Sequence, residues 1–142
     1  MSIRQISVFL ENKPGALLAL TKRLAEEKID MKAFSLAETS DFGIARFIAD
    51  DPYNAANVLK EAGYVYRLSP VIGVAIPNTP GGLNQVLEVL SEEKVNVEYM
   101  YAFHSGTENK DACMIFKVED AEKAELALTR KGIRLSEQIS SI

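Results

Sequence analysis

The sequence predicts an α+β protein that contains the same strand–helix–strand–strand–helix–strand unit twice. The first observation is a duplicated stretch: Glu11–Leu17 reads Glu-Asn-Lys-Pro-Gly-Ala-Leu, and Pro77–Leu83 reads Pro-Asn-Thr-Pro-Gly-Gly-Leu. The second is the pattern around each stretch, where an alternating apolar run comes before and apolar residues at helical spacing come after. We therefore expect a strand, a tight turn and a helix start in each half.

A nearly constant offset relates the two halves. Pro14 aligns with Pro80, an offset of 66 residues (80 minus 14), and after a small insertion Asp51 aligns with Asp120, an offset of 69. We expect two domains of similar size, at residues 1–69 and 70–142. A single copy of this size buries only part of its surface, so we expect the two copies to pack on each other.

The first copy begins with an alternating strand at residues 6–10. Pro14 suits the first position of the following helix, where the missing N–H of proline is harmless. The apolar stripe of that helix is formed by Leu17, Leu20 and Leu24.

A hairpin of two strands, at residues 30–38 and 44–50, follows the first helix. Asp51 is expected to cap a second helix, which ends at Gly63. A short strand at residues 64–68 completes the copy.

The second copy repeats this order after a junction of only two residues, Ser69 and Pro70. Its hairpin loop, at residues 104–111, is the longer one. The expected elements are strands at 71–76, 97–103, 112–118 and 133–135, and helices that begin near Leu83 and Ala121.

Some strands have apolar residues on both faces, which a half-exposed antiparallel sheet does not need. Val8, Phe9 and Leu10 are consecutive apolar residues, and the run at 71–76 is apolar apart from one glycine. Something is therefore expected to cover the second face. A homodimer is the natural candidate, although the two copies covering each other predict the same pattern.

Composition excludes several classes of function. The net charge of -4 and the pI near 5.1 mean that the chain has no excess of positive charge with which to bind the phosphates of a nucleic acid. No apolar run approaches the roughly 18 to 20 residues that cross a bilayer, and no signal-peptide core follows the start, so a cytoplasmic protein is expected. His104 and Cys113 are the only histidine and cysteine, which leaves no metal cluster or disulfide to predict and no cofactor. We expect His104 in a hairpin loop and Cys113 in the core.

The Pro-Gly turns are candidate binding sites for physical reasons. A helix N-terminus carries unpaired N–H groups and a partial positive charge, so it can receive a carboxylate. At Gly81 and Gly82 the absent side chains would let a ligand approach, and an asparagine carbonyl could accept from an ammonium group. The alternative is that Asn12 and Asn78 are only turn and cap residues, because asparagine is favoured there on local grounds.

A βαββαβ unit with Asn-x-Pro-Gly-x-Leu between its first strand and first helix resembles the ACT domain, a ferredoxin-like fold. The whole chain resembles two such domains in tandem with nothing attached. The resemblance implies that small effectors, usually amino acids, bind at interfaces between adjacent domains. It also implies that binding regulates an enzyme, either fused or separate.

The resemblance also implies site residues. In serine-binding ACT families, one asparagine before the turn and another at the start of the second strand of the facing domain hold the ligand. Asn78 and Asn96 match these positions, whereas the first copy pairs Asn12 with Asp30. The implied ligand-binding set is Asn12, Lys13, Pro14, Gly15, Ala16, Leu17, Asp30, Met31, Asn78, Thr79, Pro80, Gly81, Gly82, Leu83, Asn96 and Val97.

The sequence therefore predicts a homodimeric regulatory protein that binds a free amino acid and signals to a partner enzyme, without being an enzyme itself. One alternative is a purely structural oligomerisation module, in which the turns only connect elements. Another is a small enzyme on a ferredoxin-like scaffold, although no nucleophile with a base and no metal cluster is visible.

Overall fold

The computed structural model describes residues 3–103 and 111–136, so the expected hairpin loop, with His104, lies outside the described residues up to position 110. The chain divides into two compact units, Arg4–Ser69 and a unit that takes in the residues from Pro70 onward. Its elements are β1 (Ile3–Glu11), α1 (Ala16–Glu26), β2 (Met31–Glu38), β3 (Phe42–Ala49), α2 (Pro52–Glu61), β4 (Tyr66–Pro77), α3 (Gly82–Glu92), β5 (Val97–Phe103), β6 (Asp111–Val118) and α4 (Ala121–Arg130).

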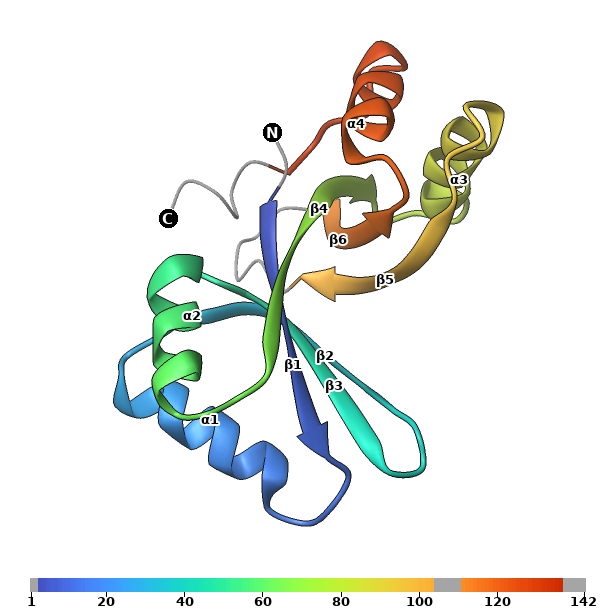
Figure 1. Cartoon of the computed structure of the whole chain (residues 1–142). Helices are drawn as coiled ribbons and strands as arrows, with labels where there is room; N and C mark the ends of the chain where they lie inside the picture. Colours follow the sequence, from blue (N-terminus) through green and yellow to red (C-terminus); the bar gives the residue numbers. More distant parts are fainter. Residues whose placement is uncertain (1–2, 104–110, 137–142) are drawn as a thin grey trace. The chain divides into compact units, whose positions relative to one another are not determined.

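The first unit is an antiparallel sheet with two helices on one face. Strand β3 lies between β1 and β2, so that Ala45 pairs with Val8 on one side and with Leu36 on the other. The Phe9 N–H donates to the Val65 oxygen (3.0 Å), which places the segment before β4 beside β1. Helices α1 and α2 lie side by side against this sheet (Figure 1).

The core of the first unit lies between the sheet and these helices. Leu20 and Leu24 of the predicted helical stripe are completely buried, and Leu17 is half-buried at its edge. The rings of Phe34 and Phe47 stack with their centroids 6.2 Å apart. Full burial of one such side chain contributes about 1.5–3 kcal/mol, so the apolar stripe fixes which face of α1 meets the sheet.

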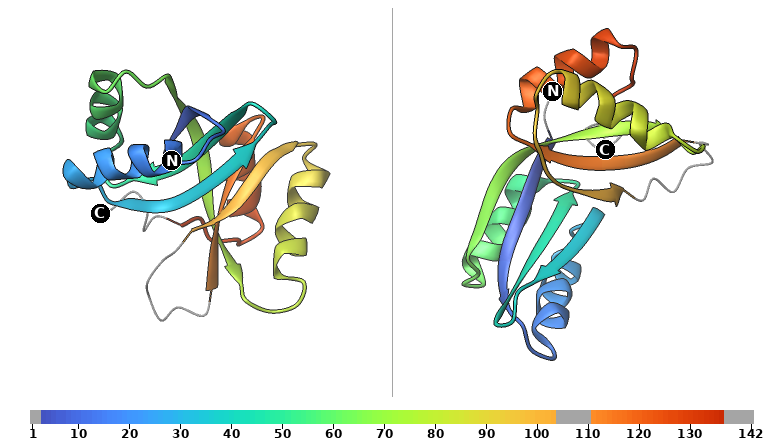
Figure 2. Two further views of the ribbon diagram at one scale, coloured as in Figure 1. Left: turned by 90° about the horizontal axis from the view of Figure 1, so that it is seen from below. Right: turned by 90° about the vertical axis from the view of Figure 1, so that its right-hand side faces the viewer.

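The second unit has the same layout. Strand β6 lies between β4 and β5, so that Met114 pairs with Val74 and with Ala102. Helices α3 and α4 pack against each other on one face of this sheet (Figure 2). Its core is formed by Ile72, Val74, Ile76, Val86, Val89, Leu90, Val95, Phe116, Val118, Ala124, Ala127 and Leu128. The α+β class and the antiparallel pairing are therefore confirmed.

Three expected strands differ in the structure. The strands predicted at 64–68 and 71–76 are one continuous strand, β4, with Ser69 and Pro70 inside it. Proline interrupts a strand by removing an N–H donor, but its fixed φ is compatible with extended backbone and it biases the preceding residue toward extended backbone. The strand predicted at 133–135 is a single bridge between Leu135 and Val74.

The helix starts also differ from expectation at the two Pro-Gly turns. Helix α1 begins at Ala16, and its N-cap Gly15 has a left-handed φ of 86°. Pro14 therefore precedes the N-cap and is not the first helical residue, because the left-handed glycine separates it from the helix. Pro80 stands in the same relation to α3. The predicted cap of the second helix is confirmed, because Asp51 is the N-cap of α2, which begins at Pro52.

Candidate ligand-binding site

The first Pro-Gly turn is closed by its own backbone. The Lys13 N–H donates to the Glu11 oxygen (3.0 Å), and the Ala16 N–H donates to the Lys13 oxygen (3.3 Å). With Gly15 in the left-handed region, the chain reverses and the helix begins, and the Ala19 N–H donates to the Gly15 oxygen (3.0 Å). This geometry requires glycine at position 15, since other residues are strained there.

The second turn repeats these bonds with one tighter contact. The Thr79 N–H donates to the Pro77 oxygen (2.8 Å), and the Gly82 N–H donates to the Thr79 oxygen (3.0 Å). A Cβ on Gly82 would overlap the Pro77 oxygen. The end of strand β4 therefore requires glycine at position 82 for its own packing, and the approach of a ligand to this turn stays a prediction. Gly81, with φ 86°, is exposed and its backbone conformation alone requires glycine.

Both turns leave the helix that follows without a side-chain cap. In the described part of the chain, the glycine N-caps of α1 and α3 make no side-chain hydrogen bond, and neither helix has an acidic residue in its first turn. Helices α2 and α4 are capped by Asp51 and Asp120, which accept from backbone N–H groups at 3.1 Å. The starts of α1 and α3 are thus the two that can receive an anion.

The two asparagines of the turns make different contacts. The Asn12 side chain donates from Nδ2 to Glu38 Oε2 (2.8 Å) and to the Thr39 oxygen (3.2 Å), which ties the first turn to the β2–β3 hairpin. Its N–H donates to the Asp41 oxygen (3.1 Å). Asn78 is exposed and makes no side-chain hydrogen bond to any residue that the structure describes.

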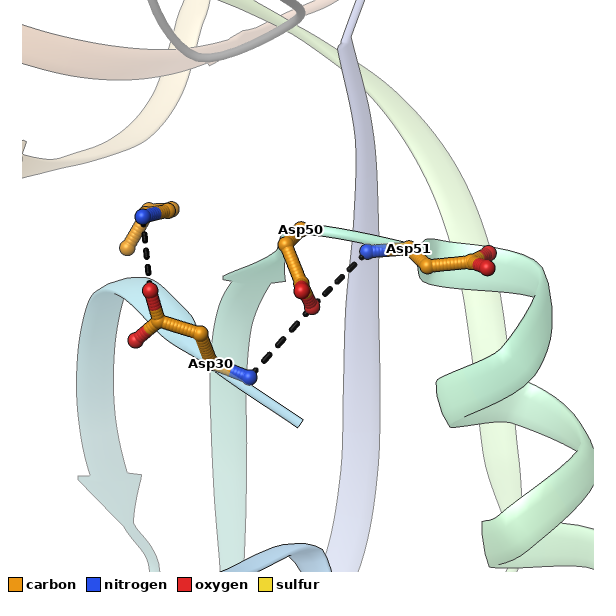
Figure 3. Close-up of polar contacts among 4 residues, drawn as sticks. Asp30, Asp50 and Asp51 are labelled. Carbon is orange, nitrogen blue, oxygen red and sulfur yellow. Dashed lines mark hydrogen bonds and ion pairs between the residues drawn. The ribbon is translucent and has the colours of Figure 1, made fainter. Parts of the chain in front are cut away.

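The second-strand positions show the same asymmetry. Asp30 pairs with Lys32 through a contact of 2.6 Å between Oδ2 and Nζ. Its N–H donates to Asp50 Oδ1 (3.3 Å), which also accepts from the Asp51 N–H at 2.9 Å (Figure 3). Asn96 uses its backbone oxygen to accept from Glu119 (3.1 Å), and its exposed side chain bonds to none of the described residues. Among the described residues, the side chains of Asn78 and Asn96 in the second unit therefore have no partner, whereas Asn12 and Asp30, at the matching positions of the first unit, both do.

The predicted residues of one unit do not come together in that unit. Asn78 follows Pro77, which pairs with Asp111 at the start of β6, whereas Asn96 precedes Val97, which pairs with Val118 at its end. The eight residues of β6 thus separate the two asparagines by a distance on the order of 20 Å. A single small ligand cannot touch both within one unit.

The remaining predicted residues lie in or beside the two Pro-Gly turns and at the starts of β2 and β5. Lys13 pairs with Glu11 at 3.0 Å on the surface. Met31 and Val97 are half-buried and pack against the cores of their units. Pro14, Thr79, Pro80 and Leu83 are exposed in or beside the turns, and Ala16 and Leu17 are half-buried at the start of α1.

A feature that the sequence reasoning missed lies at the tip of the first unit's sheet. A groove of about 270 Å³ is lined by Phe9, Ala37, Glu38, Thr39, Phe42 and Ile44. The available signal was Phe42, a large apolar residue inside a segment that otherwise reads as a polar turn. Among the described residues, no group of three His, Cys, Asp or Glu side chains could hold a metal ion, and no helix is long and apolar enough to cross a membrane.

These observations define a protein of two α+β units, each with a Pro-Gly turn that opens an uncapped helix. The family model described as an ACT domain pair matches residues 1–139, and the chain belongs to this family. The prediction of a tandem ACT protein is confirmed.

Solved structures provide further likenesses. Protein BT0572 from Bacteroides thetaiotaomicron is 36% identical with a TM-score of 0.91, over 100% of this chain and 98% of that one. The ligand-free regulatory subunit of aspartate kinase from Thermus thermophilus shares the fold at 19% identity and a TM-score of 0.64, over 89% of this chain and 91% of that one. A comparison with curated proteins finds no match.

Proposed function

We propose that this protein is a regulatory protein that binds a free amino acid and signals this binding to a partner enzyme. Membership of the ACT domain pair family supports a regulatory role. An amino acid is proposed as the ligand because of two side chains in the second unit. Asn78 and Asn96 are exposed and make no side-chain hydrogen bond to a described residue. Because these two side-chain amides have no partner among the described residues, binding a ligand through them breaks no hydrogen bond shown in the structure.

The proposed contacts follow from the chemistry of an amino acid. Its carboxylate accepts from the first-turn N–H groups of α3, whose glycine N-cap contributes no side-chain acceptor. Its ammonium group donates to the amide oxygens of Asn78 and Asn96. Because one unit holds these residues at opposite ends of its sheet, the second asparagine comes from another copy of the chain. The protein is therefore proposed to act as a homodimer.

We further propose two ferredoxin-like repeats as the domains, at residues 1–69 and 70–142. The strand pairing supports this division: β1, β3 and β2 in the first unit correspond to β4, β6 and β5 in the second. In each unit a fourth segment bonds to the first strand, through Val65 to Phe9 and through Arg134 to Ala75. Ligand binding would favour one arrangement of such domains by the difference in its affinity for the two.

No feature of the described residues favours an enzyme over a regulator, and we propose a non-enzymatic, cytoplasmic protein without a cofactor. The competing function is a structural module whose turns only connect elements. Asn12 is the observation on its side, because that side chain serves the hairpin and needs no ligand.

A thermal-unfolding assay with each of the twenty amino acids tests the proposal. We expect one or a few to raise the melting temperature, because a ligand at 100 times its Kd raises the free energy of unfolding by about 2.7 kcal/mol. Asn78→Ala and Asn96→Ala should each abolish the rise without changing unfolding in buffer. Asn57→Ala, an exposed asparagine on α2, is the matched control and should keep it. No rise with any amino acid in the wild-type protein would favour the structural module.

A further inference from the structure

The segment that follows α3 places a carboxylate beside Asn96. Val95 is part of the core of the second unit, and Val97 packs against that core. Asn96 and Glu98 are exposed. Because side chains alternate along an extended chain, Asn96 and Glu98 lie on the same side of it, about 7 Å apart along the backbone. Glu98 is not among the residues that the sequence predicts for ligand binding.

A β-bulge and an ion pair hold Glu98 in place. Val97 pairs with Val118 and Tyr99 pairs with Lys117, so Glu98 is the extra residue of a bulge in β5. Lys117 Nζ donates to Glu98 Oε2 (2.9 Å) and to the Val118 oxygen (3.2 Å), and the Lys117 side chain is only 21% exposed. The Glu98 side chain is 46% exposed, and no other described residue bonds to its carboxylate. This positioned carboxylate therefore still has acceptor capacity.

The first unit has the opposite charge at the matched position. The offset of 66 residues between the Pro-Gly turns aligns Lys32 with Glu98 (98 minus 32), and β2 has a bulge at the same place. Lys32 Nζ pairs with Oδ2 of Asp30, the residue at the position of Asn96. The first unit therefore presents a cation where the second unit presents a carboxylate.

We propose that Glu98 is a ligand-binding residue of the amino-acid site and that it restricts this site to ligands with a free ammonium group. The inference rests on the proposed function, in which the ammonium group donates to the amide oxygens of Asn78 and Asn96. An ammonium group has three N–H donors, so these two acceptors leave one donor without a partner. The Glu98 carboxylate is the third acceptor. It is the one of the three that carries a negative charge, which makes its hydrogen bond to the ligand the strongest.

The same contact determines which unit and which ligands can bind. In the first unit, Lys32 stands at the position of Glu98 and repels an ammonium group. In the second unit, Lys117 is a positioning residue, because it holds Glu98 Oε2 from the neighbouring strand β6. A site with this charge accepts a free amino acid and rejects the 2-hydroxy acid with the same side chain, whose hydroxyl group is neutral.

Calorimetric titration of the full chain with each of the twenty L-amino acids, and with the 2-hydroxy acid that corresponds to each one that binds, tests the proposal. We expect the wild-type protein to bind the 2-hydroxy acid about tenfold more weakly than the amino acid. Glu98→Gln should weaken the amino acid about tenfold, because a hydrogen bond to a charged group is lost, and should leave the affinity for the 2-hydroxy acid unchanged. Glu92→Gln removes the same charge from an exposed position at the end of α3, and it should change neither affinity.

A charge swap separates ligand binding from the structural role of the ion pair. Glu98→Lys should abolish amino-acid binding, because it reproduces the charge of the first unit. Adding Lys117→Glu restores an ion pair between β5 and β6, so the melting temperature in buffer should recover. Binding should stay absent, because the carboxylate is then on the wrong strand. Lys117→Arg, which keeps the cation, should retain binding.

The outcomes distinguish this inference from the proposed function on which it rests. Wild-type affinity for the amino acid in Glu98→Gln, or recovery of binding in the charge-swapped protein, would overturn the role of Glu98 and leave the proposed function standing. Equal affinity of the wild-type protein for an amino acid and its 2-hydroxy acid would do the same. A wild-type protein that binds none of the twenty amino acids would overturn both.

Discussion

Asn12 and Asn78 occupy the same place in the two Pro-Gly turns, but among the described residues only the Asn12 side chain has hydrogen-bond partners. The Asn12 amide reaches Glu38 and Thr39 because the β2–β3 hairpin of the first unit is short and ends beside the turn. The Asn12 side chain therefore has a structural role in the first unit, where it joins the turn to the hairpin. This difference is the reason to place the proposed amino-acid site at Asn78.

Gly82 is the residue whose replacement should have the clearest effect on stability. We expect Gly82→Ala to lower the free energy of unfolding by roughly 1–3 kcal/mol, because the added methyl group overlaps the Pro77 oxygen, a backbone atom at the strand end. Ala16→Gly, the reciprocal change in the first turn, should cost only about 0.5–1 kcal/mol through helix propensity. Urea unfolding measures both. Equal losses in the two variants would show that the close contact has no energetic consequence.

At the scale of the elements, the four helices end in two different ways. Helices α2 and α4 are followed by Gly63 and Gly132 in the left-handed region, at φ 84° and 76°. Helices α1 and α3 place Lys28 and Lys94 there, at φ 57° and 58°. A lysine side chain is strained in this conformation, whereas glycine is not.

We therefore expect Lys28→Gly and Lys94→Gly each to raise the free energy of unfolding by about 0.5–1 kcal/mol. The Ile29 N–H already donates to the Leu24 oxygen (3.0 Å), so the helix end keeps its hydrogen bonds in the first variant. Gly63→Ala should shift stability in the opposite direction by a similar amount. Thermal melting of the three variants beside the wild-type protein provides the comparison, and a destabilised Lys28→Gly would contradict the strain argument.

At the scale of the whole molecule, the length of β6 has a consequence for assembly. Asn78 and Asn96 lie at opposite ends of that strand, so a site that uses both must combine two copies of the chain. In a twofold dimer, the copy that contributes Asn78 to one site contributes Asn96 to the other.

Mixing two inactive variants tests this arrangement. Asn78→Ala and Asn96→Ala should each fail to bind the amino acid found in the panel, but unfolding and refolding them together should restore binding to about a quarter of the wild-type sites. That fraction arises because half of the dimers are mixed and each mixed dimer has one intact site. Calorimetric stoichiometry measures it. Failure of the mixture to recover binding, with both variants folded, would exclude a site that joins these asparagines across two copies.

Local patterns in the sequence predicted most of the elements and the repeat that organises them. Apolar periodicity located α1 through Leu20 and Leu24, and cap chemistry located the start of α2 at Asp51. Such features depend on residues a few positions apart, so they can be predicted without knowing the tertiary structure. The candidate site could be predicted only in part. The sequence located the two turns, but it did not show that the Asn12 side chain has hydrogen-bond partners.

The sequence by itself determined the duplicated unit, its α+β class and the positions of the Pro-Gly turns, because spacing, glycine and proline act locally on the backbone. Only the tertiary structure decided that the Asn12 side chain bonds to a hairpin and that a side chain at position 82 would overlap the Pro77 oxygen. It also decided that Phe9, Phe42 and Glu38 line one groove. Each of these depends on side chains and backbone atoms brought together by folding, and Asn12 and Glu38 are 26 positions apart in the chain.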